Sequence, residues 1–277
     1  MTTRTTPHVL LLDVDGTIVD YDTSVPGSAA DSLRRAKANG HRLFICTGRA
    51  KAEVYPHLWE LGLDGMIGGN GSYVEVDGHV VHHQVLDQSL VEQAIAWLEE
   101  RDLPFYLECN SGLFGSPDLP ERAARRLGRS PEWVRSIFPA MVYDTSRGHY
   151  DVNKISFLMA DGMSLVDLLP DLQERFDGRA SVGSWSANTE PDQFGEIGQL
   201  GISKEIGVRA LAEHLGARTE ELIGFGDARS DIPMLRACGT AVVMGQAPDE
   251  VKALADLVTA PVDHDGLAKA FAELGLV

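Results

Sequence analysis

Two aspartates follow directly after the first strongly apolar run of the chain, in the pentapeptide DVDGT at residues 13–17. The preceding run, residues 9–12, has the composition of a strand buried on both faces of a parallel sheet. Ligands of such sheets bind beyond the carboxyl ends of the strands. Because residues two apart in an extended chain point the same way, we expect Asp13 and Asp15 to face one small volume, where a cation or a shared proton would relieve their repulsion. The alternative is an ordinary Asp-Gly turn with both carboxylates in solvent.

Further polar residues stand at the ends of predicted elements elsewhere in the chain. They are Thr47 at the end of the strand 42–47, Lys204 at the start of a helix, Asp227 at the end of the strand 222–227, and Asp231 at the start of another helix. Taken alone, Thr47 could be a strand-end turn residue and Asp231 a helix N-cap. Lys204 could be solvated, but a cation in the first turn opposes the helix dipole, so we expect an anion near it. Together these residues would place carboxylates, a hydroxyl and an ammonium at one sheet edge.

Phosphoryl transfer requires this set of residue types. A carboxylate such as Asp13 can attack phosphorus and form an aspartyl-phosphate, which divides one difficult displacement into two easier ones. The transferring group spreads its negative charge over the equatorial oxygens, so positioning and charge neutralisation dominate catalysis. Mg2+ suits a site of carboxylates, a carbonyl and water, and it is the cofactor we expect. Lys204 and the Thr47 hydroxyl would hold the remaining phosphate oxygens.

Composition narrows the class of protein. The chain has 277 residues, 44% hydrophobic content and a formal net charge of -17 at pH 7, which predicts a full core and argues against nucleic acid or an anionic membrane as a partner. No apolar stretch approaches the roughly 20 residues of a membrane span, and the polar N-terminus makes a secretory signal unexpected. Three widely spaced cysteines fit a reducing compartment, so we expect a cytoplasmic protein. The oligomeric state does not follow from the sequence, and either a monomer or a homodimer is expected.

Strand and helix patterns alternate at the two ends of the chain and change in the middle. Apolar runs at 9–12, 42–47, 222–227 and 240–245 predict core strands, and helices are expected from about 26 to 40 and from 203 to 215. This alternation predicts an α/β fold with a doubly wound, Rossmann-like parallel sheet. Residues 73–81 predict a hairpin around Asp77-Gly78, after which a smaller α+β pattern begins. We therefore expect residues 1–84 and 189–277 to form one domain, and residues 85–188 to form an inserted second domain.

Four segments, in order, resemble the motifs of the haloacid dehalogenase-like superfamily. They are DVDGT at 13–17, TGR at 47–49, Lys204, and GDARSD at 226–231. The chain is most similar to the Cof-type phosphatases, which carry a type IIB cap, and the segments GNGS at 69–72, GISK at 201–204 and VMGQA at 243–247 extend the resemblance over nearly the whole chain. The resemblance implies a phosphoric monoester hydrolase whose inserted domain, 85–188, is a cap that closes over the site and contacts the substrate.

The resemblance also implies a role for each motif residue. Asp13 would be the nucleophile, and Asp15 would protonate the leaving alcohol and then activate water. Thr47, Gly48 and Lys204 would bind the phosphoryl oxygens. The ligands of Mg2+ would be Asp13, the backbone carbonyl of Asp15, Asp227 and, through water or a more distant contact, Asp231.

Three residues depart from the family pattern. Ser230 stands where an Asn is common, Glu205 replaces the usual glycine after the motif lysine, and Gln246 replaces the Asn of a late Gly-Asn-Ala loop. None removes a principal catalytic group. We expect them to affect details of phosphate binding and the rate.

The residues that would contact the rest of the substrate are less clearly marked. The candidates near loops or strand ends are Arg49, Asn110, Lys154 and Trp185, with Ser111 and His149 as further members. Each also has a structural explanation, since Arg49 could be a surface residue and Trp185 a core or cross-strand residue.

The sequence therefore predicts a Mg2+-dependent phosphatase of a small phosphorylated metabolite, with a sugar phosphate favoured and flavin mononucleotide or pyridoxal phosphate as other candidates. The alternatives are a sugar phosphomutase, a non-hydrolytic phosphoacceptor or regulatory protein, and a non-catalytic binding subunit. Asp15 argues against a phosphoacceptor, because a receiver needs no acid two residues after its phosphorylated aspartate. Selectivity lies in cap residues that no motif marks, so the substrate is left open.

Overall fold

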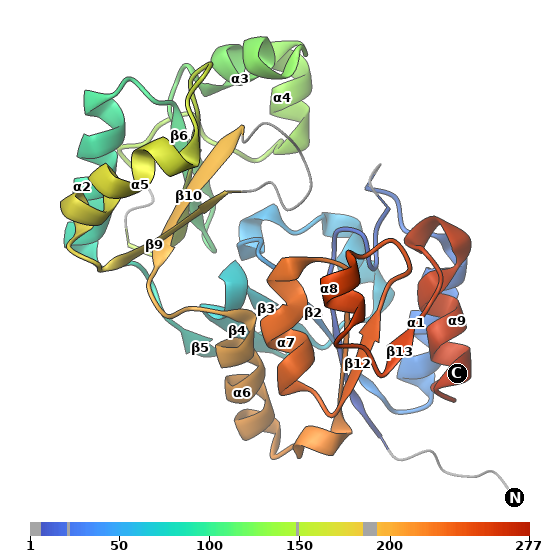
Figure 1. Cartoon of the computed structure of the whole chain (residues 1–277). Coiled ribbons are helices and arrows are strands. Elements are labelled where there is room, and N and C mark those ends of the chain that lie inside the picture. Colours follow the sequence, from blue (N-terminus) through green and yellow to red (C-terminus); the bar gives the residue numbers. More distant parts are fainter. Residues whose placement is uncertain (1–6, 21–22, 148–149, 185–192) are drawn as a thin grey trace, which may run out of the picture. The chain divides into compact units, whose positions relative to one another are not determined.

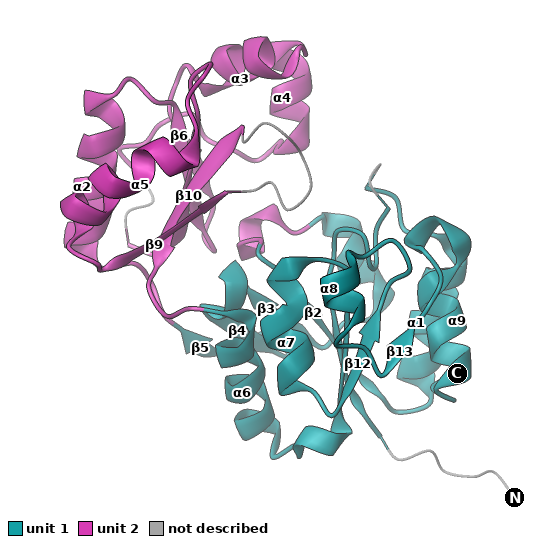
Figure 2. Cartoon of the chain, viewed as in Figure 1, with its two compact units in different colours: residues 1–48, 55–83, 203–277 teal, residues 49–54, 84–202 magenta. Residues whose placement is uncertain are grey.

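The chain divides into two compact units, which Figures 1 and 2 show in a computed structural model that describes residues 7–20, 23–147, 150–184 and 193–277. Unit 1 comprises residues 1–48, 55–83 and 203–277, and unit 2 comprises residues 49–54 and 84–202. Within the described residues, no helix has the length and the apolar character that crossing a membrane requires.

Unit 1 is built on a sheet whose strand order is β13-β12-β11-β1-β2-β3-β4-β5. The strands are β1 Val9–Leu12, β2 Arg42–Cys46, β3 Gly65–Gly68, β4 Tyr73–Val76, β5 His79–His83, β11 Leu222–Gly226, β12 Thr240–Val243 and β13 Leu257–Val258. Strands β13 to β3 in this order are parallel, and β4 and β5 extend the sheet as an antiparallel edge. The predicted α/β fold with a doubly wound sheet is confirmed, and the parallel part contains the strands that precede the motif residues.

Helices cover both faces of this sheet. The helices of unit 1 are α1 Gly27–Ala38, α6 Lys204–Leu215, α7 Ile232–Ala237, α8 Asp249–Lys252 and α9 Gly266–Glu273. Buried side chains of α6, α7 and α8 form one cluster with Leu11 of β1 and Phe44 of β2. On the other face α1 and α9 pack together, and the ring of Phe271 in α9 lies 5.1 Å from that of Phe225 in β11, measured between centroids. Both sides of each central strand are therefore buried, which explains the uninterrupted apolar runs.

The predicted hairpin is formed by β4 and β5. Asp77 and Gly78 connect the two strands with φ values of 50° and 78°, as a two-residue turn with both residues in the left-handed region requires. The short 3-10 helices of unit 1 are η2 Pro56–Leu61, η3 Gly69–Gly71, η4 Thr219–Glu221, η5 Arg229–Asp231 and η6 Val262–His264.

Unit 2 contains a separate antiparallel sheet with the strand order β7-β6-β8-β10-β9. Its elements are η1 Lys51–Glu53, α2 Gln88–Glu100, β6 Phe105–Cys109, β7 Leu113–Gly115, α3 Leu119–Leu127, α4 Pro131–Ile137, β8 Val152–Leu158, α5 Leu165–Phe176, β9 Ala180–Ser184 and β10 Phe194–Gln199. Trp97 of α2 and Leu172 of α5 pack into one core with Phe157 of β8. The opposite face of the sheet carries Tyr106 and Leu158, which pack against α3.

The units differ from the predicted division of the chain at three places, which are residues 49–54, residue 84 and the segment 189–202. We assigned that segment to the first domain, but its described residues, 193–202, belong to unit 2, where β10 pairs with β8 and β9. Residues 49–54 also belong to unit 2, although the residues before and after them belong to unit 1. The chain therefore changes unit inside the TGR motif, between Gly48 and Arg49, and again after residue 54, as well as at the two ends of the long insertion.

Candidate active site

The motif residues follow neighbouring strands of the sheet in unit 1. Strand β1 lies between β11 and β2 and runs parallel to both. Asp13, Thr47 and Asp227 are the residues that follow β1, β2 and β11. The Asp13 N–H donates to the Phe225 carbonyl at 2.9 Å, so strand pairing continues up to the first aspartate. The three residues emerge at one edge of the sheet because the strands are parallel.

Lys204 lies between two of the aspartates. Its Nζ is 2.7 Å from Oδ1 of Asp13 and 2.6 Å from Oδ1 of Asp231, and all three residues are buried. Burial by itself would lower the pKa of Lys204, but the charges of Asp13 and Asp231 outweigh it and raise the pKa. These two carboxylates are the anions at the first turn of α6, and they hold the ammonium in its charged form.

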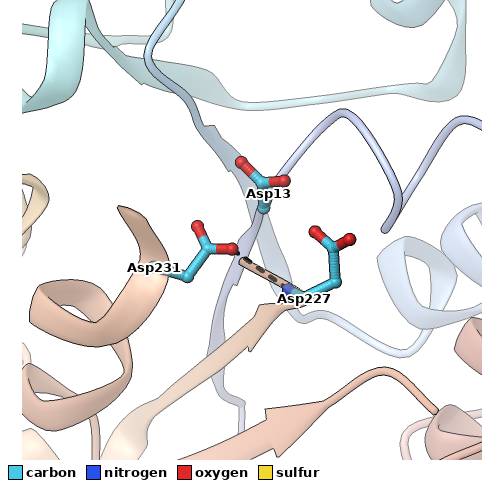
Figure 3. Close-up of side chains that lie close together, drawn as sticks. All are labelled: Asp13, Asp227 and Asp231. Carbon is cyan, nitrogen blue, oxygen red and sulfur yellow. Dashed lines mark hydrogen bonds between the residues drawn. The ribbon is translucent and has the colours of Figure 1, made fainter. Parts of the chain in front are cut away.

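Asp231 shapes the loop between β11 and α7. Its Oδ2 accepts hydrogen bonds from the N–H groups of Asp227, at 3.0 Å and drawn in Figure 3, and of Ala228, at 2.9 Å. A Cβ on Gly226 would lie 2.6 Å from Cγ of Asp231, so only glycine lets the loop close around this carboxylate. Asp231 does precede α7, but its side chain makes no capping hydrogen bond into the helix. It holds the preceding loop and Lys204 instead.

The chain turns sharply after Asp13. The carbonyl of Val14 accepts hydrogen bonds from N–H groups further along the turn, and Gly16 has a φ of 85°. Asp15 is exposed on this turn, yet its charge helps to raise the pKa of Asp227. Asp13 and Asp15 thus lie at the same edge of the sheet but in different environments, one buried and one open to solvent.

Three buried carboxylates converge at this edge. Asp13, Asp227 and Asp231, which Figure 3 draws, each offer an oxygen. These three oxygens lie within 4.8 Å of one another. Burial, followed by the charge of Asp231, raises the pKa of Asp13 well above its usual value, although Lys204 acts in the opposite direction. Burial and Asp231 also raise the pKa of Asp227, to about 6. The crowding of negative charge indicates that a cation would be accommodated here.

The donor atoms fit a hard divalent cation. Oδ1 of Asp227 is buried and has no hydrogen-bond partner among the described residues. Carboxylate oxygens are the protein ligands that Mg2+ prefers. The trio contains the predicted ligands Asp13, Asp227 and Asp231, whereas the Asp15 side chain is not part of it. A contribution from the Asp15 backbone carbonyl stays a prediction.

Thr47 and Gly48 lie against the GNGS segment. The Thr47 N–H donates to the Ile67 carbonyl at 2.9 Å, and the Thr47 carbonyl accepts from the Asn70 N–H at 3.2 Å. A Cβ on Gly48 would lie 3.0 Å from Oδ1 of Asn70, which has a φ of 56°. The backbone of the predicted phosphate-binding segment is therefore fixed by the turn that follows β3.

Two of the three departures from the family pattern are Ser230 and Glu205, each next to a motif residue in the sequence. Ser230 is exposed. Glu205 forms an ion pair with Arg209, one helical turn further along α6, which compensates its charge. A negative charge after the motif lysine is therefore balanced locally.

Gln246, the third departure, contacts the candidate site directly. Its Nε2 donates to the Gly16 carbonyl at 2.6 Å and lies 3.3 Å from Oδ2 of Asp227. The sequence marked Gln246 only as a departure in a late loop. Its partners come from two other loops, so their proximity becomes apparent only in the folded chain.

The predicted substrate residues that the structure describes have partners within unit 2. Arg49 Nη1 donates to the Glu53 carbonyl at 3.4 Å, and Asn110 Oδ1 accepts from the Lys51 N–H at 3.1 Å. The Ser111 hydroxyl donates to Asp151 at 2.8 Å. Lys154 Nζ forms ion pairs with Glu108, at 3.2 Å, and with Glu196, at 2.5 Å. Trp185 and His149 lie outside the described residues. A substrate role for any of them stays a prediction.

Comparison with known proteins places the chain in a family. Residues 10–271 match the haloacid dehalogenase-like hydrolase family. The chain is 29% identical over 286 residues to the pyridoxal phosphate phosphatase YbhA of Escherichia coli strain K12, with 97% of each chain covered. It is 25% identical over 274 residues to the 5-amino-6-(5-phospho-D-ribitylamino)uracil phosphatase YitU of Bacillus subtilis strain 168, covering 96% of this chain and 97% of that protein.

A solved structure to which the chain is similar is also that of a phosphatase. The subclass IIB sugar phosphatase BT4131 superimposes with a TM-score of 0.75 at 28% identity, covering 98% of this chain and 100% of that chain. The ordered motifs, the two sheets and the carboxylate trio are thus found in a chain that matches these three phosphatases over 96–98% of its length. The chain belongs to the haloacid dehalogenase-like hydrolase family, as a phosphatase of its Cof-type IIB branch.

Proposed function

We propose that the chain is a Mg2+-dependent phosphatase that hydrolyses a small phosphomonoester through an aspartyl-phosphate formed on Asp13. The observation that carries the proposal is the buried group in which Lys204 bridges Asp13 and Asp231 beside Asp227. This group supplies a nucleophilic carboxylate, a fixed ammonium and further carboxylates for a cation within one small volume. Phosphoryl transfer depends on such positioning and charge neutralisation.

In the first half of the proposed reaction, a carboxylate oxygen of Asp13 attacks phosphorus and the bond from phosphorus to the ester oxygen breaks. The leaving oxygen takes a proton from the Asp15 carboxyl group, which the turn after β1 exposes to solvent. Lys204 orients the Asp13 carboxylate by its 2.7 Å contact with Oδ1. Mg2+, if held by Asp13, Asp227 and the backbone carbonyl of Asp15, with Asp231 through water or a more distant contact, would supply positive charge. That charge would favour the anionic form of Asp13 and offset the negative charge of the phosphoryl group.

In the second half, the Asp15 carboxylate accepts a proton from a water molecule as the water oxygen attacks the phosphorus. The acyl phosphate bond breaks, which releases inorganic phosphate and restores the Asp13 carboxylate. Asp15 suits both steps because it lies two residues from the nucleophile and near the Asp227 carboxylate. Thr47 and Gly48, fixed against Asn70, would hold phosphoryl oxygens during both steps.

The substrate we favour is a sugar phosphate. The similarity to the sugar phosphatase BT4131 covers the whole chain, including unit 2. YbhA and YitU, of comparable similarity, are named as phosphatases of pyridoxal phosphate and of a ribitylaminouracil phosphate, so phosphorylated cofactors and their precursors are the second class to test.

We assign unit 1 as the catalytic core and unit 2 as the cap that selects the substrate. Unit 1 contains every residue of the candidate phosphoryl-transfer site. Unit 2 contains Arg49, Asn110 and Lys154, the described members of the predicted substrate set. On this assignment the cap extends to residue 202 and includes residues 49–54.

A sugar phosphomutase and a non-hydrolytic phosphoacceptor are the alternatives to hydrolysis. The discriminating experiment supplies purified protein with Mg2+ and a panel of phosphorylated metabolites together with p-nitrophenyl phosphate, and measures inorganic phosphate over many turnovers. Continuous release that stops when EDTA is added supports the phosphatase. One equivalent of p-nitrophenol per chain without free inorganic phosphate would support a phosphoacceptor, and isomerised sugar phosphate without free phosphate would support the mutase.

A further inference from the structure

Gln246 joins three loops at the edge of the sheet in unit 1. Its Nε2 donates to the Gly16 carbonyl at 2.6 Å and to Oδ2 of Asp227 at 3.3 Å. Its Oε1 accepts a hydrogen bond from the Val262 N–H at 3.2 Å. The partners lie after β1, β11 and β13, so one side chain connects the turn that carries Asp15 with the loop that carries Asp227.

The three contacts fix the orientation of the amide. A carboxamide has a carbonyl oxygen that accepts and an NH2 group that donates. In the reversed orientation the NH2 group of Gln246 would face the Val262 N–H, and its oxygen would face two oxygen atoms. The hydrogen-bond network therefore permits one orientation, in which the amide donates to Asp227.

Gly16 makes the approach of Asp227 possible. A Cβ at position 16 would lie 2.3 Å from Oδ2 of Asp227, which is too close for two atoms that are not bonded to each other. Oδ2 is thus held between the Gly16 backbone and the Gln246 amide. Oδ1 of the same carboxylate has no hydrogen-bond partner among the described residues.

We propose that Gln246 is a positioning residue that occupies Oδ2 of Asp227 and thereby leaves Oδ1 available to a divalent cation. The inference rests on the proposed function, in which Asp13, Asp227 and Asp231 hold that cation. Hydrogen bonds that orient the carboxylate ligands of a metal strongly affect its affinity. By its bond to the Gly16 carbonyl, the same amide also keeps the turn after Asp13 in place.

The length of the side chain is part of the inference. Asn, the common residue of this loop in the family, is one methylene group shorter than Gln. Unless the backbone moved, an Asn amide at position 246 would lose either the hydrogen bond from the Val262 N–H or the two hydrogen bonds to Gly16 and Asp227. In this chain Gln246 is the residue that spans all three loops.

The test measures the affinity of Mg2+ alone for the substrate-free protein by titration calorimetry. We expect Gln246→Met, which keeps the length and removes the hydrogen bonds, to weaken Mg2+ binding at least about tenfold. Gln246→Asn should weaken it by a smaller factor. Gln88→Met is the matched control, because Gln88 is exposed in unit 2 and its side-chain amide donates to Glu92. The dissociation constant of Mg2+ for this variant should equal that for the parent.

A second measurement separates positioning from a purely structural role. Binding to the native state raises the melting temperature, so the parent should melt at a higher temperature in Mg2+ than in EDTA, and this difference should shrink in Gln246→Met at the same Mg2+ concentration. A structural role alone would lower both melting temperatures and preserve their difference.

The outcomes separate failure of this inference from failure of the proposed function. A parent that binds no Mg2+ would contradict the proposed cation site and the inference with it. A parent that binds Mg2+, together with a folded Gln246→Met of equal affinity, would overturn the inference alone. If Gln246→Met does not fold, Gln246→Asn decides, because parental affinity in that variant overturns the inference and weaker binding supports it.

Discussion

Nζ of Lys204 lies 2.7 Å from Oδ1 of Asp13, although the two residues are 191 positions apart in the sequence. The contact joins the residue after the first strand to the first residue of α6, the helix that follows the inserted segment. Both side chains are buried, so the pair forms only when the two parts of unit 1 on either side of unit 2 are assembled. The candidate site therefore requires that these distant parts of unit 1 are folded together.

Replacing Lys204 with Met should damage both stability and activity. The variant leaves the Asp13 and Asp231 carboxylates buried without their cation, a change that costs about 3–5 kcal/mol in comparable buried pairs. Denaturant unfolding measures the stability loss, and phosphate release measures the activity, which should fall below detection. Lys269→Met is the control, because Lys269 is exposed and its Nζ donates to the backbone carbonyl of His264. A Lys204→Met variant with parental stability would contradict the role of the bridge.

Gly16→Ala should abolish the cation site while Gly78→Ala leaves it intact. The two glycines have similar positive φ values, 85° and 78°, so both variants carry a comparable backbone penalty. Only at position 16 would the new Cβ collide with Asp227, because nothing lies within 4 Å of a Cβ at position 78. Calorimetric titration with Mg2+ checks the difference. Equal Mg2+ affinity in the two variants would show that the approach of Asp227 to Gly16 is irrelevant to binding.

Mg2+ should stabilise the parent protein and not the variant Asp227→Asn. A ligand present at 100 times its dissociation constant stabilises a native state by about 2.7 kcal/mol. Asp227→Asn replaces one carboxylate of the buried trio with a neutral group and should lose most of this effect. Thermal melts in EDTA and in Mg2+ test the expectation, with the exposed Asp31→Asn as a control that keeps the full shift. An undiminished shift in Asp227→Asn would place the cation elsewhere.

Stability should decrease with rising pH because of Glu108 in unit 2. Burial and the charge of Glu53 raise the pKa of Glu108 well above 4.5, although Lys154 opposes them. The folded state therefore holds this proton more tightly than the unfolded chain does. The resulting stability is fully present below pH 4.5 and is lost as the pH rises through the folded pKa, by at most about 1.4 kcal/mol per pH unit.

Glu108→Gln should remove that contribution to the pH dependence. Gln can keep a hydrogen bond with the Ser156 hydroxyl, which donates to Glu108 in the parent. Unfolding free energies measured from mildly acidic to alkaline pH should therefore fall less steeply in Glu108→Gln than in the parent. The exposed Glu100→Gln, with surface ion pairs only, should retain the parental slope. Identical slopes for the parent and Glu108→Gln would contradict the assignment.

The sequence predicted the parts of unit 1 that strong local patterns mark. The uninterrupted apolar runs predicted β1, β2, β11 and β12, since strands covered by helices on both faces need apolar residues on both sides. The Asp77-Gly78 hairpin was predicted because its turn requires two residues that tolerate positive φ. Strand β3, with glycine at both ends, was not predicted, because its pattern lacks the side chains that mark a strand.

Strand β10 explains why the predicted boundary at residue 188 differs from the division into units. Its sequence, FGEIGQ, contains two glycines, and Gly195 lies so close to Phe157 that a Cβ would approach the ring to 2.2 Å. Cross-strand packing in unit 2 therefore determines this strand, and the composition of the segment does not mark it.

The candidate site was predicted as a set of residues but not as a set of contacts. Asp13, Lys204, Asp227 and Asp231 were each marked by a position at an element end. Asp231 accepts a hydrogen bond from the loop before it, and Gln246 donates one to Asp227. Both hydrogen bonds depend on the positions that the loops take in the folded chain. Local sequence carries no signal for such contacts.

The most direct test of the account is the chemical fate of Asp13 during turnover. Protein mixed with Mg2+ and p-nitrophenyl phosphate is quenched in acid within a turnover, and its peptides are analysed by mass spectrometry. The account predicts one added phosphoryl group on Asp13 in the parent, together with complete loss of hydrolysis in Asp13→Asn. Undiminished hydrolysis by Asp13→Asn, or a phosphoryl group on a different residue, would contradict it.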